Sequence, residues 1–337
     1  MQILRQLAPP KCTRTTPLNL LPRLFTTSSR SLERMPQRYD RSVRFDRVPR
    51  KLPPHVSIPK LLPDHLSYYW DTTPPTKEQL LHASKFFKFR PPTFLWSAAE
   101  FKNMDFGDSP EVCVLGRSNV GKSSLLNTLL CKRIANTSSK RGRTKLMNAF
   151  AVGGAEDNGK NRLVVLDMPG YGKGGRSEWG REILKYLGKR RQLKRAFLLL
   201  DASHGIKKSD KQIIELFKEL SVPYQIIFVK VDRILFVGSR REPSQTALKA
   251  RITQLRTAME DVRDLVQPTP EDDGLGVGEV LACSSERWLN GERMGIDAVR
   301  FAMLQAADLQ LERRTRLVRM VETIPFEEIY KERPGES

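Results

Sequence analysis

Nine consecutive residues have the types and spacing that bind a polyphosphate. They match the pattern GxxxxGK[ST] and lie between the apolar run Glu111–Leu115 and a helix-like pattern of leucines. A glycine-rich turn in this position points its backbone N–H groups at phosphate oxygens. Lys122 would contact the β and γ phosphates and the Ser123 hydroxyl would ligate Mg²⁺; the alternative is a glycine turn without a ligand. The predicted phosphate loop comprises Gly116, Arg117, Ser118, Asn119, Val120, Gly121, Lys122, Ser123 and Ser124.

Two groups that would lie near the γ-phosphate follow downstream. The DxxG sequence Asp167-Met168-Pro169-Gly170 comes directly after the apolar run 163–166. At a strand end, Asp167 can reach Mg²⁺ through a water molecule, and the Gly170 N–H can sense the γ-phosphate. Thr144, which lies between the two motifs, is the candidate for a second magnesium-ligating hydroxyl in the first switch.

A third group of residues could read the base. Lys230-Val231-Asp232 follows the apolar run 226–229 and matches the motif KxD. A carboxylate accepts hydrogen bonds from the N1–H and exocyclic amine of guanine, whereas adenine N1 is itself an acceptor, so guanine is favoured. Val229 stands where such motifs usually have Asn or Thr, so one bond between the base loop and the phosphate loop is missing and a lower affinity is expected. Cys283, Ser284 and Ser285 can offer backbone N–H groups to guanine O6, or they form a plain strand-to-helix turn.

These residues need a scaffold, and the pattern of apolar runs predicts an α/β fold of the P-loop NTPase type. Strand-like runs alternate with helix-like ones, which indicates a mostly parallel six-stranded sheet with helices on both faces. The turn 153–159 predicts a hairpin and therefore one antiparallel edge strand. A closing helix is expected over 295–309. The predicted strands are Glu111–Leu115, Leu146–Val152, Arg162–Asp167, Ala196–Asp201, Tyr224–Lys230 and Glu279–Cys283.

Composition divides the 337-residue chain into four parts. Residues 1–32 contain five Lys or Arg and no Asp or Glu, which is typical of an organelle transit peptide; the alternative is a disordered basic tail. Residues 33–93 are rich in Arg and Pro and predict a largely disordered arm in which 77–89 holds a short helix. Residues 94–310 form the nucleotide-binding domain, and 311–337 form a charged tail. No run approaches the roughly 20 apolar residues that a transmembrane helix requires.

Together the motifs resemble the EngB (YihA/YsxC-type) ribosome-biogenesis GTPases, a branch of the Ras-like P-loop proteins. The similarity rests on GRSNVGKSS, GRT, DMPGYG, the Lys230/Asp232 pair and Ser284-Ser285, and it runs from Phe94 to Leu309. The resemblance implies that Ser123 and Thr144 ligate Mg²⁺. Met168, in place of the usual Leu, and Val229 depart from the family. Beyond the phosphate loop, the implied GTP-binding residues are Gly142, Arg143, Thr144, Lys145, Leu146, Asp167, Met168, Pro169, Gly170, Val229, Lys230, Val231, Asp232, Cys283, Ser284 and Ser285.

The residues leave the catalytic group unknown. Ras-like enzymes often place a Gln after DxxG to orient the attacking water, and Tyr171 occupies that place, so intrinsic hydrolysis should be slow. Asn119 resembles the asparagine that coordinates K⁺ in cation-activated relatives; the alternative is that it only stabilises its loop. Three arginines lie near enough in the sequence to contribute to hydrolysis, and no catalytic role is assigned to any of them: Arg117, Arg141 and Arg143.

The charge pattern suggests a partner. Residues 171–195 contain nine Lys or Arg against two Glu, and the apolar positions Trp179, Ile183 and Leu187 recur at helical spacing. We expect the basic face to point outward and to contact ribosomal RNA phosphates when GTP is bound, with a solvated charged face as the alternative. The resemblance and the leader imply a monomeric assembly factor for the large subunit of the mitochondrial ribosome, in the matrix. A GTP-dependent interaction module at the inner membrane is the second hypothesis, and the DxxG and KxD motifs argue against a third, a P-loop kinase.

Overall fold

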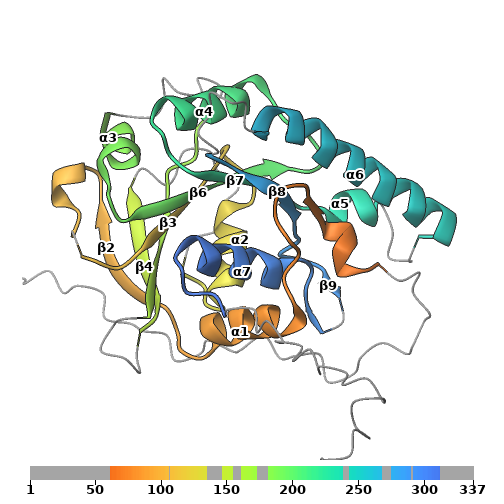
Figure 1. Ribbon diagram of the computed structural model, residues 1–337, viewed down its shortest axis with the longest axis horizontal. Coiled ribbons are helices and arrows are strands. Elements are labelled where there is room, and N and C mark those ends of the chain that lie inside the picture. The colour runs from red at the N-terminus through yellow and green to blue at the C-terminus, as the bar shows by residue number, and fades with distance from the viewer. Residues whose placement is uncertain are drawn as a thin grey trace, which may run out of the picture. The chain divides into compact units, whose positions relative to one another are not determined.

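A computed structural model of the 337-residue chain shows a large sheet between two layers of helices (Figure 1), and a separate two-stranded sheet of β9 (Trp288–Leu289) and β10 (Glu292–Arg293). It describes residues 61–105, 107–134, 146–154, 161–172, 181–237, 243–267, 275–289 and 291–311. The strands of the sheet are β1 (Ser67–Tyr69), β2 (Thr93–Ala98), β3 (Glu111–Gly116), β4 (Met147–Gly153), β5 (Arg162–Asp167), β6 (Leu193–Asp201), β7 (Tyr224–Val229) and β8 (Gly276–Ala282). The α-helices are α1 (Lys77–Lys88), α2 (Lys122–Leu129), α3 (Arg181–Lys189), α4 (Lys208–Glu219), α5 (Asp232–Leu235), α6 (Gln245–Val266) and α7 (Ile296–Ala306).

The predicted motifs lie together at the carboxyl ends of the parallel strands. The order is β1-β8-β7-β6-β3-β5-β4-β2, and the five strands from β8 to β5 are parallel. Helices α3, α4 and α6 lie on one side of the sheet, and α1, α2 and α7 on the other (Figure 1). Because the carboxyl ends of parallel strands lie on the same side of a sheet, the loops after β3, β5, β7 and β8 converge there.

The α/β class and all six predicted strands are confirmed, but over the described residues the sheet has eight strands and not six. The strand predicted to be antiparallel, β4, does pair antiparallel with β5, but it is not an edge strand, because β1 and β2 pair antiparallel with β8 and β4 and form the two edges. These two strands are short, and proline-rich segments surround them, so they show no sustained alternation of apolar residues. Both strands are defined by backbone pairing with a neighbouring strand. Tyr69 lies opposite Glu279 of β8, and Phe94 lies opposite Phe150 of β4.

Residues 61–93 therefore belong to the domain, and the expectation of disorder is wrong for this part of the arm. Tyr68 of β1 is buried beneath α6, where the Arg256 guanidinium lies 4.1 Å from its ring and Arg263 donates a 3.0 Å hydrogen bond to its hydroxyl. The short helix predicted over 77–89 is α1. Its N-terminus is capped by Thr76, whose hydroxyl accepts the Gln79 N–H, and it packs against α7. Residues 1–60 and 312–337 lie outside the described residues.

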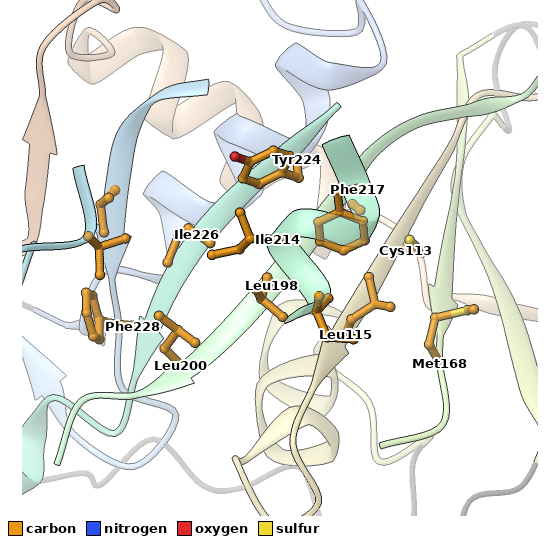
Figure 2. Close-up of a cluster of buried hydrophobic side chains, with 14 of the residues drawn as sticks. Cys113, Leu115, Met168, Leu198, Leu200, Ile214, Phe217, Tyr224, Ile226 and Phe228 are labelled. Atoms are coloured by element: carbon orange, nitrogen blue, oxygen red, sulfur yellow. The ribbon is translucent and has the colours of Figure 1, made fainter. Parts of the chain in front are cut away.

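The central strands are apolar along their whole length because both of their faces are buried. In β6, Leu198 and Leu200 face α4 and α6, while Phe197 and Leu199 face α2 and α7. Figure 2 shows the first of these two cores, in which Ile214 and Phe217 of α4 pack on β6 and β7. The expected closing helix over 295–309 is α7. Within the described ranges, none of the helices is long and apolar enough to cross a membrane.

One buried ion pair joins α3 to the first residue of β3. Arg190 follows the last turn of α3, and its guanidinium makes two hydrogen bonds with the Glu111 carboxylate and a 2.8 Å bond with the Asp105 carbonyl. Tyr186 also donates to Glu111, at 3.0 Å. Both charged groups are buried, so Arg190 does not belong to the outward basic face predicted for 171–195. Ile183 and Leu187 face the core as predicted, and Trp179 lies outside the described residues.

We predict that Arg190→Met strongly destabilises the protein. The substitution leaves the Glu111 carboxylate buried without its cation, which costs about 3–5 kcal/mol of unfolding free energy. Arg191→Met is the matched control, because Arg191 is exposed and its loss should change stability by about 0.5 kcal/mol or less. Urea denaturation measures both variants, and equal stability of the two would contradict the structural role of Arg190.

Candidate nucleotide-binding site

The phosphate loop lies between β3 and α2, at the edge where the parallel strands end. Gly121 precedes the first residue of α2 and has φ +116°, a left-handed conformation that favours glycine. Gly170 approaches the loop so closely that a Cβ on it would lie 3.2 Å from Ser118 Cα. Two backbone hydrogen bonds tie the DxxG segment to the loop: Ser118 N–H donates to the Tyr171 carbonyl at 2.8 Å, and Tyr171 N–H donates to the Gly116 carbonyl at 3.3 Å. The two predicted phosphate-binding segments are thus neighbours.

Lys122 and Asp167, predicted to serve the phosphates and the metal, form an ion pair with each other. The Lys122 ammonium contacts Asp167 Oδ1, and both side chains are buried. A bound polyphosphate would offer the ammonium stronger anionic partners, which would leave the Asp167 carboxylate to face the metal. Ser123 lies in the same first turn of α2 as Lys122, and its hydroxyl and the Asp167 carboxylate offer the kinds of oxygen donor that Mg²⁺ prefers. Gly142, Arg143, Thr144 and Lys145 lie outside the described residues, and Leu146 is exposed just before β4.

Lys230 connects the base loop to the phosphate loop. Its ammonium donates 2.8 Å hydrogen bonds to the Asn119 carbonyl and to Asp201 Oδ2. Val229 is buried at the end of β7 and cannot make the bond that Asn or Thr would provide there, yet the loops remain joined through Lys230. Sequence reasoning did not assign a role to Asp201, although its place at the end of β6 is the signal that could have revealed one. Burial raises the pKa of the Asp201 carboxyl, but the hydrogen bond and charge of Lys230 more than offset this and hold the pKa below its usual value.

Asp232 is oriented by the serine that was predicted to contact the base. Ser284 donates a 2.5 Å hydrogen bond from its hydroxyl to Asp232 Oδ1. The backbone N–H of Ser284 donates to the Met294 carbonyl at 2.9 Å, and that of Cys283 donates to Phe228 at 2.8 Å. Of the three N–H groups predicted to serve guanine O6, these two are used within the protein, and Ser285 is the remaining candidate. Burial raises the pKa of the Cys283 thiol to about 12, so this side chain packs as a neutral core residue.

A pocket of about 410 Å³ lies beside the carboxylate of Asp232. The Arg287 guanidinium lies 4.3 Å from the centre of the Phe236 ring and forms one wall. Apolar and charged side chains both line the pocket, which suits a planar, polar base. Its lining residues are Asp232, Arg233, Phe236, Val237, Glu286 and Arg287.

Asp210 is a second residue that sequence reasoning did not assign. The Tyr171 hydroxyl donates a 2.7 Å hydrogen bond to Asp210 Oδ1, and Arg117 Nε lies 3.2 Å from the same oxygen. Tyr171 is fully buried, and burial together with the charge of Asp210 raises the pKa of its hydroxyl well above the usual value. In this position Tyr171 is a core residue and does not reach toward the phosphates, in keeping with the expectation that it does not replace a water-orienting Gln. Arg117 is engaged with Asp210 and the Gly205 carbonyl.

The chain is similar to known GTP-binding proteins. The domain family described as "50S ribosome-binding GTPase" matches residues 111–230. The probable GTP-binding protein EngB of Prosthecochloris aestuarii is 37% identical over 49% of this chain and 83% of its own length. The corresponding protein of Chelativorans sp. is 36% identical over 57% of this chain and 87% of its own length. The chain belongs to the EngB family of GTPases. Era of Aquifex aeolicus, solved with GDP·AlF4⁻, aligns with a TM-score of 0.42 and 18% identity over 60% of this chain and 57% of that one.

We predict that Asp232→Asn lowers the affinity of this EngB protein for guanine nucleotides and raises it for xanthine nucleotides. An amide cannot accept both guanine hydrogen bonds, and losing one to a charged group costs about 1.5–3 kcal/mol, roughly a ten- to hundredfold loss. Xanthine has a carbonyl oxygen in place of the exocyclic amine, and the N–H of the Asn amide can donate to this oxygen. Calorimetric titration with GDP and XDP measures both affinities.

The matched control is Asp261→Asn, because Asp261 is exposed on α6. This variant should bind both nucleotides as the unmodified protein does. An Asp232→Asn variant that binds GDP with unchanged affinity would show that Asp232 does not read the base.

Proposed function

We propose that this EngB-family GTPase assists the assembly of the large subunit of the mitochondrial ribosome, and that GTP controls its binding to ribosomal RNA. Two observations support the ribosomal partner: the match to a domain family described as ribosome-binding, and a cluster of exposed basic residues on α3 and the segment after it. The composition of residues 1–32 supports the mitochondrial matrix as the location.

The basic cluster is the single observation that carries the proposal. Its five members lie on α3 and in the segment from there into β6, and all are exposed. The hydrophobic residues of α3 face the core, so these charges are turned toward solvent on the first described helix after the DxxG segment in the chain. Lys and Arg in such a cluster neutralise RNA phosphates and release counterions. The cluster consists of Arg181, Lys185, Lys189, Arg191 and Lys194.

The chain's own residues divide the work of GTP binding and hydrolysis. Lys122 holds the β and γ phosphates, Asp232 and Ser285 hold the guanine, and the Gly170 N–H contacts the γ-phosphate. When bound, Mg²⁺ neutralises charge on the phosphates, and Ser123 with Asp167 would hold it. Since Tyr171 is committed to the core, intrinsic hydrolysis is slow and is completed by an additional group.

We propose K⁺ as that additional group, held in part by the Asn119 side chain. Asn119 is exposed at the tip of the phosphate loop with φ +66°. We predict that KCl accelerates GTP hydrolysis relative to NaCl at equal ionic strength, and that Asn119→Gly removes this difference. Glycine retains the left-handed backbone, so the loop should keep its shape and its GTP affinity. Equal rates in KCl and NaCl for the unmodified protein would contradict the potassium proposal, as measured by phosphate release.

Sucrose-gradient sedimentation tests the ribosomal function. The chain without residues 1–32 is mixed with mitochondrial lysate and loaded with a non-hydrolysable GTP analogue or with GDP. We predict that it migrates with large-subunit particles only in the GTP-analogue state, because GTP orders the RNA-binding surface. A Lys185→Glu/Arg191→Glu variant should remain at the top of the gradient.

Arg190 is left unchanged in this variant, because it is buried and its substitution would report on stability. If the unmodified protein remains at the top in both nucleotide states, the assembly proposal is contradicted. Co-sedimentation with anionic liposomes would then favour the second hypothesis, a GTP-dependent module at the inner membrane.

A further inference from the structure

We propose that the first turn of α4 is a second RNA-phosphate contact, and that the buried carboxylate of Asp210 couples this contact to the nucleotide site. The proposal rests on the RNA-binding function proposed above and extends it to a different helix and a different set of residues. It names the lysines that bind RNA and the hydrogen bond through which GTP controls them.

Asp210 joins three elements that are distant in sequence. Its side chain is completely buried. Oδ1 accepts the Tyr171 hydroxyl at 2.7 Å and lies 3.2 Å from Arg117 Nε of the phosphate loop. Oδ2 accepts the Lys207 backbone N–H at 2.9 Å, just before α4 begins. One carboxylate therefore holds the phosphate loop, the segment after DxxG and the start of α4 together.

The start of α4 carries three exposed lysines. Lys207 is the N-cap residue, Lys208 is the first helical residue and Lys211 lies one turn further. The N-terminus of a helix already has a partial positive charge, so cations placed there are destabilising. The one acidic residue of this first turn is Asp210, which is buried and paired. Positive charge is thus concentrated on the exposed surface at a cost in stability, and polyanionic RNA is the partner that such a surface fits.

Tyr171 provides the connection from GTP to these lysines. It directly follows Gly170, the residue expected to contact the γ-phosphate, and its backbone is bonded to the phosphate loop on both sides. A shift of Gly170 on GTP binding would be passed to Tyr171, because Gly170 and Tyr171 share a peptide bond, and we expect it to change the hydrogen bond between the Tyr171 hydroxyl and Asp210. Asp210 in turn fixes the first turn of α4 through the Lys207 N–H. GTP at Gly170 and RNA at the start of α4 would therefore both act on the same hydrogen bond, the one between Tyr171 and Asp210.

The lysine contact is tested by the salt dependence of RNA binding. The full chain is titrated with a fluorescent transcript of mitochondrial large-subunit ribosomal RNA, with GTP analogue bound, at 50 to 200 mM KCl. Lys208→Glu/Lys211→Glu should weaken binding at least tenfold. The slope of log K against log salt, which is negative, should become less steep by about 1.4 to 1.8, because each lost phosphate contact contributes about 0.7 to 0.9.

Lys77→Glu/Lys85→Glu is the matched control. Lys77 and Lys85 are exposed on α1, on the opposite side of the sheet, and Lys77 is the first residue of its helix as Lys208 is of α4. The control should bind RNA within twofold of the unmodified protein. Equal losses in the two double variants would overturn the α4 contact and leave general electrostatics as the explanation.

The coupling is tested with Tyr171→Phe, which keeps the buried ring and removes only the hydroxyl. With both nucleotides at saturation, the ratio of RNA affinities in the GTP-analogue and GDP states should fall toward one. Tyr186→Phe is the control, because Tyr186 is also buried and also donates to a buried carboxylate, at the far end of β3. It should keep the ratio of the unmodified protein.

The two proposals fail in distinguishable ways. If the unmodified protein binds the transcript in neither nucleotide state, the RNA-binding function itself is contradicted. If the unmodified protein binds RNA and Tyr171→Phe retains its full nucleotide dependence, the coupling through Asp210 is overturned while the RNA-binding function stands.

Discussion

The parallel pairing of β3 with β5 is the constraint on which the nucleotide site depends. Its register places Val114, near the end of β3, beside Asp167, the last residue of β5. The phosphate loop leaves β3 and the DxxG segment leaves β5 at the same edge, which brings Lys122 against Asp167 and Gly170 against Ser118. Strands β6, β7 and β8 continue the parallel pairing, and they deliver Asp201, Lys230 and Ser284 to the same edge. A different strand order would separate all of these groups.

Three buried carboxylates hold the cations of this edge. Asp167 pairs with Lys122, Asp201 with Lys230 and Asp210 with Arg117. A buried carboxylate is destabilising unless a cation and hydrogen bonds compensate it, so each pair fixes a loop in place. The pairs differ in what GTP does to them. A bound phosphate would compete directly for Lys122, while Lys230 and Arg117 make their contacts with the phosphate loop and its surroundings. Two of the three ion pairs therefore hold the phosphate loop before a nucleotide binds, and the change proposed at Asp210 concerns its hydrogen bond with Tyr171 and not its ion pair with Arg117.

The sequence predicted the parts of this site that depend on local pattern. The phosphate loop, the six central strands and α7 follow from glycine spacing and apolar runs within short windows. Strands β1 and β2 were missed because they exist only through pairing with β8 and β4, which no local pattern shows. The ion pairs of Asp210 and Glu111 were missed for the same reason. Arg190 was assigned to a basic surface because charge in a sequence does not reveal whether its partner is solvent or a buried carboxylate.

The most direct test of this account is the choice between GTP and ATP, with and without magnesium. The account holds that Asp232, Lys230 and the phosphate loop form one preorganised guanine-nucleotide site in which Ser123 and Asp167 hold the metal. Equilibrium titration of the full chain should therefore give binding of GTP at least a hundredfold tighter than that of ATP, and EDTA should weaken the binding of GTP. Equal affinity for the two nucleotides would contradict the base site, and GTP binding that EDTA leaves unchanged would contradict the metal site.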